Sequence, residues 1–120
     1  MRNEPSGNQR HFPRVRQLHL VEVSRFDEAG FRADLATGRT LDLSYGGLRL
    51  ELGHPLPLRS VVALTLALDK DLAQIRGKVV YLEQLDKDRC AMGIQFTKVP
   101  PRSRRVLDNF VDNAIAESGA

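Results

Sequence analysis

The sequence predicts one domain of short antiparallel β-strands, arranged as a barrel or a sandwich, with a single helix at its end. Short apolar runs recur through residues 15–96, and turn residues such as glycine and proline separate them. Apolar side chains in residues 106–115 recur instead at the spacing of one helical face. The length of 120 residues suits one domain with its own hydrophobic core.

The first predicted strands are short. Residues 15–25 alternate partly between apolar and polar side chains, which favours a strand. An alanine-glycine pair at 29–30 predicts a turn before a second strand at 31–35. Thr37-Gly38-Arg39 predicts another turn, which would separate that strand from a further one at 40–43.

The strands of the second half are more strongly patterned. After the Gly46-Gly47 pair, residues 48–52 alternate strictly between apolar and charged side chains. The next predicted strand, at 61–68, carries one apolar face, formed by Val62, Leu64, Leu66 and Leu68. Two further strands are predicted at 72–82 and 90–96. Closely spaced strands joined by turns favour an antiparallel arrangement over a parallel α/β sheet.

A helix is predicted for about residues 101–117. Pro100-Pro101 is typical of a helix start, and Gly119 is typical of a stop. The apolar stripe comprises Val106, Leu107, Phe110, Val111, Ala114 and Ile115. We expect this stripe to pack on its own barrel, although a second subunit is an alternative partner for it.

The charge is concentrated at the beginning of the chain. The protein has 18 Lys and Arg against 15 Asp and Glu, and residues 1–16 hold four arginines and one glutamate. The entire net charge of +3 therefore lies in those sixteen residues. This excludes a broad basic face for long duplex nucleic acid and indicates a small anionic partner. Residues 1–14 hold only one large apolar side chain, Phe12, which is too little to offset the entropy lost on ordering, so we expect them to form a mobile arm. We expect residues 15–120 to form the folded domain.

Several classes of protein are disfavoured. No apolar run approaches the roughly 20 residues that cross a bilayer, and no signal-peptide core is evident, so we expect a cytoplasmic protein. Cys90 is the single cysteine, which excludes an internal disulfide and a thiolate-rich metal site. The three histidines lack a metal-ligand spacing. Ser44 is not surrounded by the GxSxG pattern of a nucleophile, and we expect no enzyme activity, metal or cofactor.

Two segments carry candidate chemistry. Arg10 and Arg14 lie four residues apart, and Pro13 disfavours a helix between them. Guanidinium groups bind phosphates bidentately and stack on flat rings, which suits a ligand with phosphates and purines. The alternative is that the arginines belong to a solubilising tail.

The second segment is Asp-Leu-Ser-Tyr-Gly-Gly at residues 42–47, between two predicted strands. Asp42 can accept hydrogen bonds from the N1–H and N2–H edge of guanine, and the Ser44 hydroxyl can reach a phosphate. Gly46 and Gly47 allow close backbone approach and a positive φ. The alternative is a capped, bulged turn in which Asp42 and Ser44 bond to their own backbone.

The two motifs together resemble the PilZ family of cyclic di-GMP receptors. That family has an RxxxR pair about 28 residues before a (D/N)xSxxG turn in a domain of short β-strands. Arg10 and Arg14 match the first motif, and Asp42, Ser44 and Gly47 match the second. The resemblance covers most of the chain and extends to Leu48-Arg49-Leu50, Val79-Val80-Tyr81, Gly93-Ile94-Gln95-Phe96 and the helix after the last strand.

The resemblance implies a six-stranded antiparallel β-barrel with one C-terminal α-helix. It also implies that Arg10 and Arg14 hold phosphate and stack on guanine as the arm closes. Asp42 and Ser44 would then contact guanine and phosphate from the barrel surface, while Gly47 allows the turn.

The chain departs from the family pattern at Gln9. Many members have another arginine there, and a neutral residue favours one bound ligand over two stacked ones. Tyr81 occupies a position where an aromatic residue is frequent, so it can line the site or belong to the core. The predicted ligand-binding residues are Arg10, Arg14, Asp42, Ser44 and Gly47, with Gln9, Gly46 and Tyr81 as further candidates.

These expectations predict a stand-alone cyclic di-GMP receptor that closes its arm over the ligand and signals to a separate effector protein. The resemblance implies second-messenger control of bacterial motility or biofilm formation. We expect a monomer rather than a dimer, with no nucleic acid partner and no membrane insertion. One alternative is a PilZ-like adaptor that does not bind cyclic di-GMP. Another is a small RNA-binding barrel, which the aromatic content of 6% disfavours because base stacking needs exposed rings.

Overall fold

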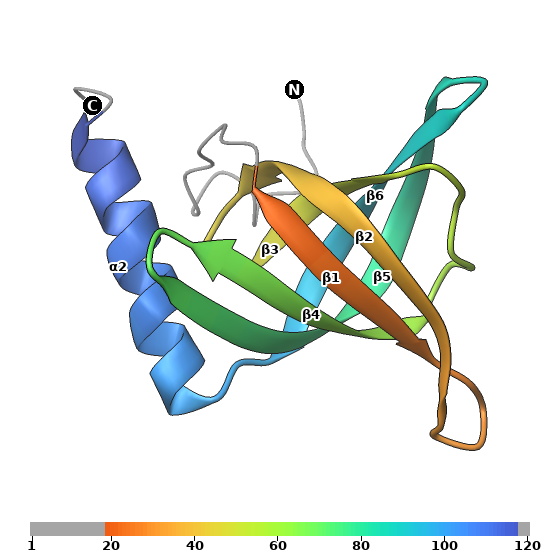
Figure 1. Cartoon of the computed structure of the whole chain (residues 1–120), viewed down its shortest axis with the longest axis horizontal. Helices are drawn as coiled ribbons and strands as arrows, with labels where there is room; N and C mark the ends of the chain where they lie inside the picture. The colour runs from red at the N-terminus through yellow and green to blue at the C-terminus, as the bar shows by residue number, and fades with distance from the viewer. Residues whose placement is uncertain (1–18, 118–120) are drawn as a thin grey trace, which may run out of the picture.

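A computed structural model describes residues 19–117, which form six β-strands and one helix (Figure 1). In chain order the elements are β1 (Leu20–Phe26), β2 (Arg32–Leu43), β3 (Gly47–Leu52), β4 (Val61–Leu68), β5 (Asp71–Asp86), β6 (Arg89–Lys98) and α2 (Pro101–Glu117). The strands close into a barrel in the order β1-β2-β3-β6-β5-β4, and every neighbouring pair is antiparallel. The predicted six-stranded barrel with one C-terminal helix is confirmed.

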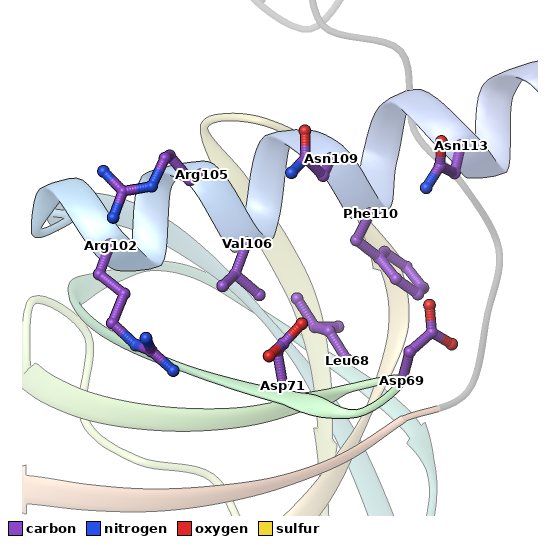
Figure 2. A pocket seen from close by; sticks show the side chains of 9 residues that line it. All are labelled: Leu68, Asp69, Asp71, Arg102, Arg105, Val106, Asn109, Phe110 and Asn113. Carbon is purple, nitrogen blue, oxygen red and sulfur yellow. The ribbon is translucent and has the colours of Figure 1, made fainter.

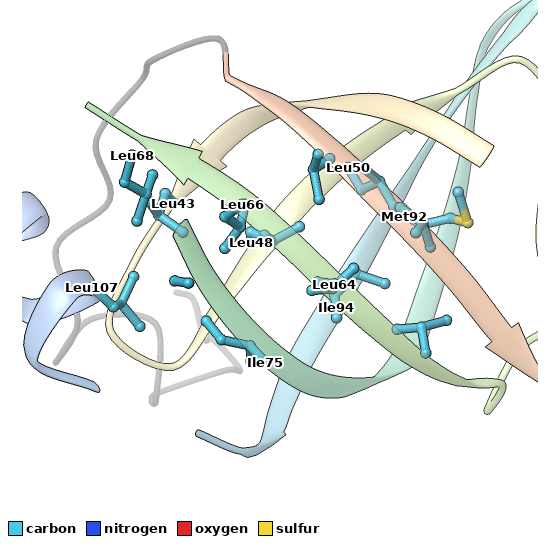
Figure 3. Close-up of a cluster of buried hydrophobic side chains, with 14 of the residues drawn as sticks. Leu43, Leu48, Leu50, Leu64, Leu66, Leu68, Ile75, Met92, Ile94 and Leu107 are labelled. Atoms are coloured by element: carbon cyan, nitrogen blue, oxygen red, sulfur yellow. The ribbon is translucent and has the colours of Figure 1, made fainter. Parts of the chain in front are cut away.

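The core of the barrel forms because side chains on each strand alternate between its inside and outside. In β4 the predicted apolar face points inward, and its four members are at most 2% exposed: Val62, Leu64, Leu66 and Leu68. Leucines from β2 and β3 meet them in the middle of the barrel (Figure 3). Each leucine side chain buried in this way contributes about 1.5–3 kcal/mol of transfer free energy.

The helix α2 packs on its own barrel, against β5 and β4, and lies across one end of it (Figure 1). Its bounds match the prediction, and Pro101 occupies the first helical position, where its missing N–H costs nothing. The buried face contains Leu107, Phe110 and Val111. The turns that join β1 to β2 and β5 to β6 project from the opposite end of the barrel.

One predicted turn is wrong. Residues 37–39 lie inside β2, which runs without interruption from Arg32 to Leu43. Gly38 marks a close approach between strands: a Cβ at this position would stand 2.5 Å from the Glu51 carbonyl oxygen and from Leu52 Cδ2. Glycine is found both in turns and at close approaches inside strands, so the residue type alone does not tell which of the two is present. β5 is also longer than predicted and ends at Asp86.

Candidate functional site

The turn between β2 and β3 is closed by its own backbone. Ser44 is buried, and both its N–H and its hydroxyl donate to the Gly47 carbonyl oxygen, at 2.9 and 3.1 Å. The Phe96 N–H donates to the Gly46 carbonyl oxygen at 2.9 Å, which ties the turn to β6. The hydrogen-bonded turn considered as an alternative is therefore present at Ser44.

The two glycines of this turn have different surroundings. A Cβ on Gly47 would collide with the Ile94 carbonyl oxygen of β6, so this position requires glycine for close packing of two strands. A Cβ on Gly46 would meet no atom within 4 Å. The expected positive φ is not found, because among residues 19–117 the only glycine in the left-handed region is Gly30. Gly47 thus serves a contact between strands and not an unusual backbone angle.

A β-bulge turns Asp42 toward the outside of the barrel. Thr40 pairs with Leu50 and is fully buried, but the next paired residue of β2 is Asp42, opposite Arg49, so Leu41 is an extra residue. Without this insertion Asp42 would follow the inward side of Thr40, since side chains alternate with a period of two. The bulge therefore places the carboxylate on the outer face.

A second bulge does the same for Tyr81. In β5, Val79 pairs with the buried Ile94, whereas Tyr81 pairs with Gly93, which leaves Val80 as the extra residue. A Cβ on Gly93 would overlap the Tyr81 ring, so the ring lies over β6 at a position that has no side chain. Tyr81 is half-buried on the outer face.

The two outward-turned residues belong to one row across four strands. Asp42 pairs with Arg49, Arg49 with Gly93, and Gly93 with Tyr81. Arg49 stands inside this row: its Nη1 lies 3.7 Å from Asp42 Oδ2, and its Nη2 donates to Glu83 Oε1 at 3.0 Å. We call Asp42, Arg49, Gly93, Tyr81 and Glu83 the outer row.

Arg49 keeps its positive charge in this setting. Burial works to lower the pKa of Arg49, but its hydrogen bond to Glu83 and the charges of Glu83 and Asp42 outweigh that effect, and the pKa is raised. The outer row therefore presents a fixed cation between two carboxylates and next to an aromatic ring. Such a surface can accept hydrogen bonds through its carboxylates and stack on a flat ring.

The turn is also tied to α2. The Tyr45 hydroxyl donates to Asp112, and the Arg104 guanidinium donates to the Tyr45 carbonyl oxygen at 2.8 Å. Arg104 pairs in addition with Asp108 at 3.1 Å. The hydrogen bond to Asp112, followed by burial and the charges of Asp112 and Asp108, raises the pKa of Tyr45 above its ordinary value. One side of α2 is thus joined to the turn by direct hydrogen bonds.

The predicted site residues are only partly within the described chain. Asp42, Ser44, Gly46 and Gly47 lie in or beside the turn, and Tyr81 reaches the same face through the bulge. The predicted ligand contacts Gln9, Arg10 and Arg14 lie outside the described residues.

Sequence reasoning assigned no role to Arg49 or Glu83. The signal was available for Arg49, because strict alternation in residues 48–52 places it on the outer face one strand away from Asp42. Nothing in the sequence pairs Glu83 with it.

Two other kinds of site are not found in this part of the chain. Within residues 19–117, no three or more His, Cys, Asp or Glu residues are grouped so that they could hold a metal ion. Over the same range, α2 is neither long enough nor apolar enough to span a bilayer.

Cys90 is a buried free cysteine. Burial raises the pKa of its thiol, with a further contribution from the charge of Glu51.

Three solved structures share this architecture. The inhibitor of motility MotI/DgrA from Bacillus subtilis superimposes with a TM-score of 0.71 at 10% identity, over 98% of this chain and 52% of that one. The PilZ domain of YcgR from Escherichia coli, solved with c-di-GMP, has a TM-score of 0.68 at 16% identity, with coverages of 92% and 94%. The MrkH–c-di-GMP complex from K. pneumonia has a TM-score of 0.68 at 18% identity, with coverages of 99% and 54%.

These likenesses establish the fold. This chain spans about half the length of MotI/DgrA and MrkH, but nearly all of the YcgR domain. A search of curated proteins found no significant match. The family model for the PilZ domain matches residues 8–113, which is most of the chain and includes both predicted motifs. The chain therefore belongs to the PilZ domain family.

Proposed function

We propose that this chain is a cytoplasmic receptor for cyclic di-GMP that acts as an adaptor on a separate effector protein and is not an enzyme. The observation that carries the proposal is the outer row, which brings a carboxylate, a guanidinium and an aromatic ring beside the glycine turn of a PilZ domain. Support also comes from two structural neighbours, the YcgR PilZ domain and MrkH, which were solved with c-di-GMP.

In this proposal Asp42 recognises guanine. A guanine edge offers N1–H and N2–H donors, and an ionised carboxylate accepts both. Arg49 holds this carboxylate from one side at 3.7 Å, which limits its rotation before the ligand arrives. Tyr81 offers the face of its ring to a purine, and base–aromatic stacking contributes about 1–3 kcal/mol.

Arg10 and Arg14 supply the second half of the site. We propose that residues 1–14 act as an arm whose two guanidinium groups bind the ligand phosphates, while residues 15–120 form the barrel that receives them. Ordering each arm residue costs about 1–2 kcal/mol of backbone entropy. Each charge-assisted hydrogen bond returns about 1.5–3 kcal/mol, so several must form together. The neutral Gln9 favours one ligand per chain.

Ser44 has a constrained part in this mechanism. Its hydroxyl proton is donated to the Gly47 carbonyl oxygen, and a phosphate oxygen can only accept. Contact between Ser44 and a phosphate therefore requires the hydroxyl to exchange one acceptor for another. The hydrogen bond from the Ser44 N–H to the same carbonyl oxygen does not involve the hydroxyl and can hold the turn in either case. Gly46 and Gly47 bring the backbone of the same turn close to the ligand.

The signal would pass to an effector protein that recognises the closed arm together with the adjoining turn, with the chain acting as a monomer. Tyr45 lies in that turn and contacts Asp112 and Arg104 of α2. A change in the turn on ligand binding therefore reaches the helix through direct contacts.

Titration calorimetry with cyclic di-GMP, GTP and a short RNA tests the proposal on the full chain. We expect heat only with cyclic di-GMP, and we expect Arg14→Ala and Asp42→Ala each to weaken binding at least about tenfold, which corresponds to about 1.4 kcal/mol. Arg2→Ala and Glu28→Ala are matched controls, since the first removes another arginine of the predicted arm and the second an exposed acid of the β1–β2 turn.

Two outcomes would contradict parts of the proposal separately. Wild-type protein that gives neither heat nor amide shifts with cyclic di-GMP would exclude the receptor function and favour an adaptor without this ligand. Binding that leaves the NMR signals of the Arg10 and Arg14 amides unmoved would exclude closure of the arm.

A further inference from the structure

A groove lies between α2 and the turn that joins β4 to β5 (Figure 2). It has a volume of about 400 Å³ and a floor of three apolar side chains, Leu68, Val106 and Phe110. The helix-side wall carries Arg102, Arg105, Asn109 and Asn113, and the strand-side wall carries Asp69 and Asp71. The groove occupies a different flank of α2 from the one that contacts Tyr45.

The polar side chains of the walls are exposed and available. Among the residues that the structure describes, the side chains of Asp71, Arg102, Arg105, Asn109 and Asn113 make no hydrogen bond or ion pair. Asp69 contributes only a charge near His19, where it works against the lowering of the pKa of that histidine. Side chains of opposite charge thus line the same groove without pairing with each other, and Arg102 is the one that extends toward the strand side (Figure 2).

We propose that this groove binds an extended segment of a partner protein in which an apolar side chain is flanked by an acidic and a basic residue. The apolar side chain would cover Val106, which is half-buried, and the edge of Phe110, which is buried. The acidic residue would pair with the arginines of the helix-side wall, and the basic residue with the aspartates of the strand-side wall.

The dimensions of the groove suit such a segment. Arg102 and Asn113 are eleven residues apart on α2, which corresponds to about 16 Å at 1.5 Å per residue. An extended chain rises about 3.3 Å per residue, so about five residues fit along the wall. Asn109 and Asn113 offer amide groups that both donate and accept, as the backbone of an extended peptide requires.

The charges also argue against another class of partner. Asp69 and Asp71 would repel the phosphates of a nucleic acid on the strand side, and the two arginines alone make a small basic surface. The proposal does not depend on cyclic di-GMP, because none of the outer-row residues lines the groove.

Selection from a random peptide display library, with the intact chain as bait, tests this inference. We expect the enriched peptides to place an apolar residue between an acidic and a basic one. Fluorescence anisotropy with the best peptide should then show at least tenfold weaker binding for Asp71→Lys and for Arg105→Glu. Matched controls are Glu28→Lys and Arg32→Glu on the β1–β2 hairpin, at the other end of the barrel, which should change affinity less than twofold.

A charge-reversed peptide gives a second, independent readout. The Asp71→Lys/Arg105→Glu double variant should bind the peptide whose acidic and basic residues are exchanged more tightly than it binds the original peptide. Because both positions are exposed and unpaired in the described chain, these variants should fold as the wild type does. A selection with no enriched peptide, or peptides whose affinity the groove variants leave unchanged, would overturn the inference.

Discussion

Replacing Gly47 by alanine tests why the turn beside the outer row contains glycine at this position. A Cβ there would collide with the Ile94 carbonyl oxygen, a backbone atom that no rotamer change can move away. Gly46→Ala is a matched control one residue earlier, because its Cβ would meet open space. Neither glycine has a positive φ, so the two variants differ in contact and not in backbone strain.

The expected loss of unfolding free energy follows from the groups that must move. Separating β3 from β6 to admit a methyl group costs about 1–3 kcal/mol. The same movement weakens the hydrogen bonds from Ser44 N to Gly47 O and from Phe96 N to Gly46 O, each of which contributes about 0.5–1.5 kcal/mol. Alanine returns about 0.4–1 kcal/mol by restricting the unfolded chain. With the middle of each range, the net loss for Gly47→Ala is about 3 kcal/mol, whereas Gly46→Ala should be neutral or gain up to about 1 kcal/mol.

Urea unfolding followed by far-UV circular dichroism measures this difference. With an m-value typical of a small domain, the midpoint of Gly47→Ala should fall by about 1–3 M urea. Equal midpoints for the two alanine variants would refute the steric argument. A Gly47→Ala protein with full stability but without cyclic di-GMP binding would show that this glycine serves the ligand instead.

Three other contacts make predictions of their own. Gly93→Ala should weaken cyclic di-GMP binding in calorimetry about as much as Tyr81→Ala, because a Cβ at position 93 displaces the phenol ring; full affinity in both variants would exclude the ring from the site. Burial lowers the pKa of His19 below its ordinary 6.5, so the unfolded state binds the proton first and the melting temperature should fall as the pH drops below 6.5. His19→Asn should reduce that fall, and an identical pH profile would contradict it. A spectrophotometric titration should show that the pKa of Tyr45 is raised, and Asp112→Asn should lower it by removing the hydrogen bond to a carboxylate; an unchanged titration would contradict this.

Much of the barrel could be predicted from local patterns. The inward face of β4 and the bounds of α2 follow from apolar periodicities of two and of about 3.6 residues. Burial of these apolar side chains stabilises both elements. Gly38 shows the limit of such patterns. Its sequence neighbours are typical of a turn, but its place in β2 depends on how closely β3 passes, a contact with residues that are distant in sequence.

The candidate site depends on two features that the sequence did not predict. Strict alternation from Thr40 would turn Asp42 inward, and strict alternation from Val79 would turn Tyr81 inward. One inserted residue in each strand reverses both orientations. A bulge has no distinct composition here, since Leu41 and Val80 are ordinary strand residues, and its position follows from pairing across the whole sheet. Asp42 and Tyr81 therefore share the outer face for a reason that local sequence patterns do not contain.

The closed order of the strands limits how other chains can attach to this protein. β1 pairs with β4 as well as with β2, so within residues 19–117 every strand has a neighbour on both sides in the closed part of the barrel. Only the hairpin ends, such as residues 32–38 of β2 and 82–86 of β5, pair on one side. In the closed part of the barrel, a partner therefore cannot extend the sheet by adding a strand of its own, which is a common and weakly selective mode of attachment. A partner that binds this part of the barrel contacts side chains instead, so single substitutions that leave the barrel intact can change which partner it selects.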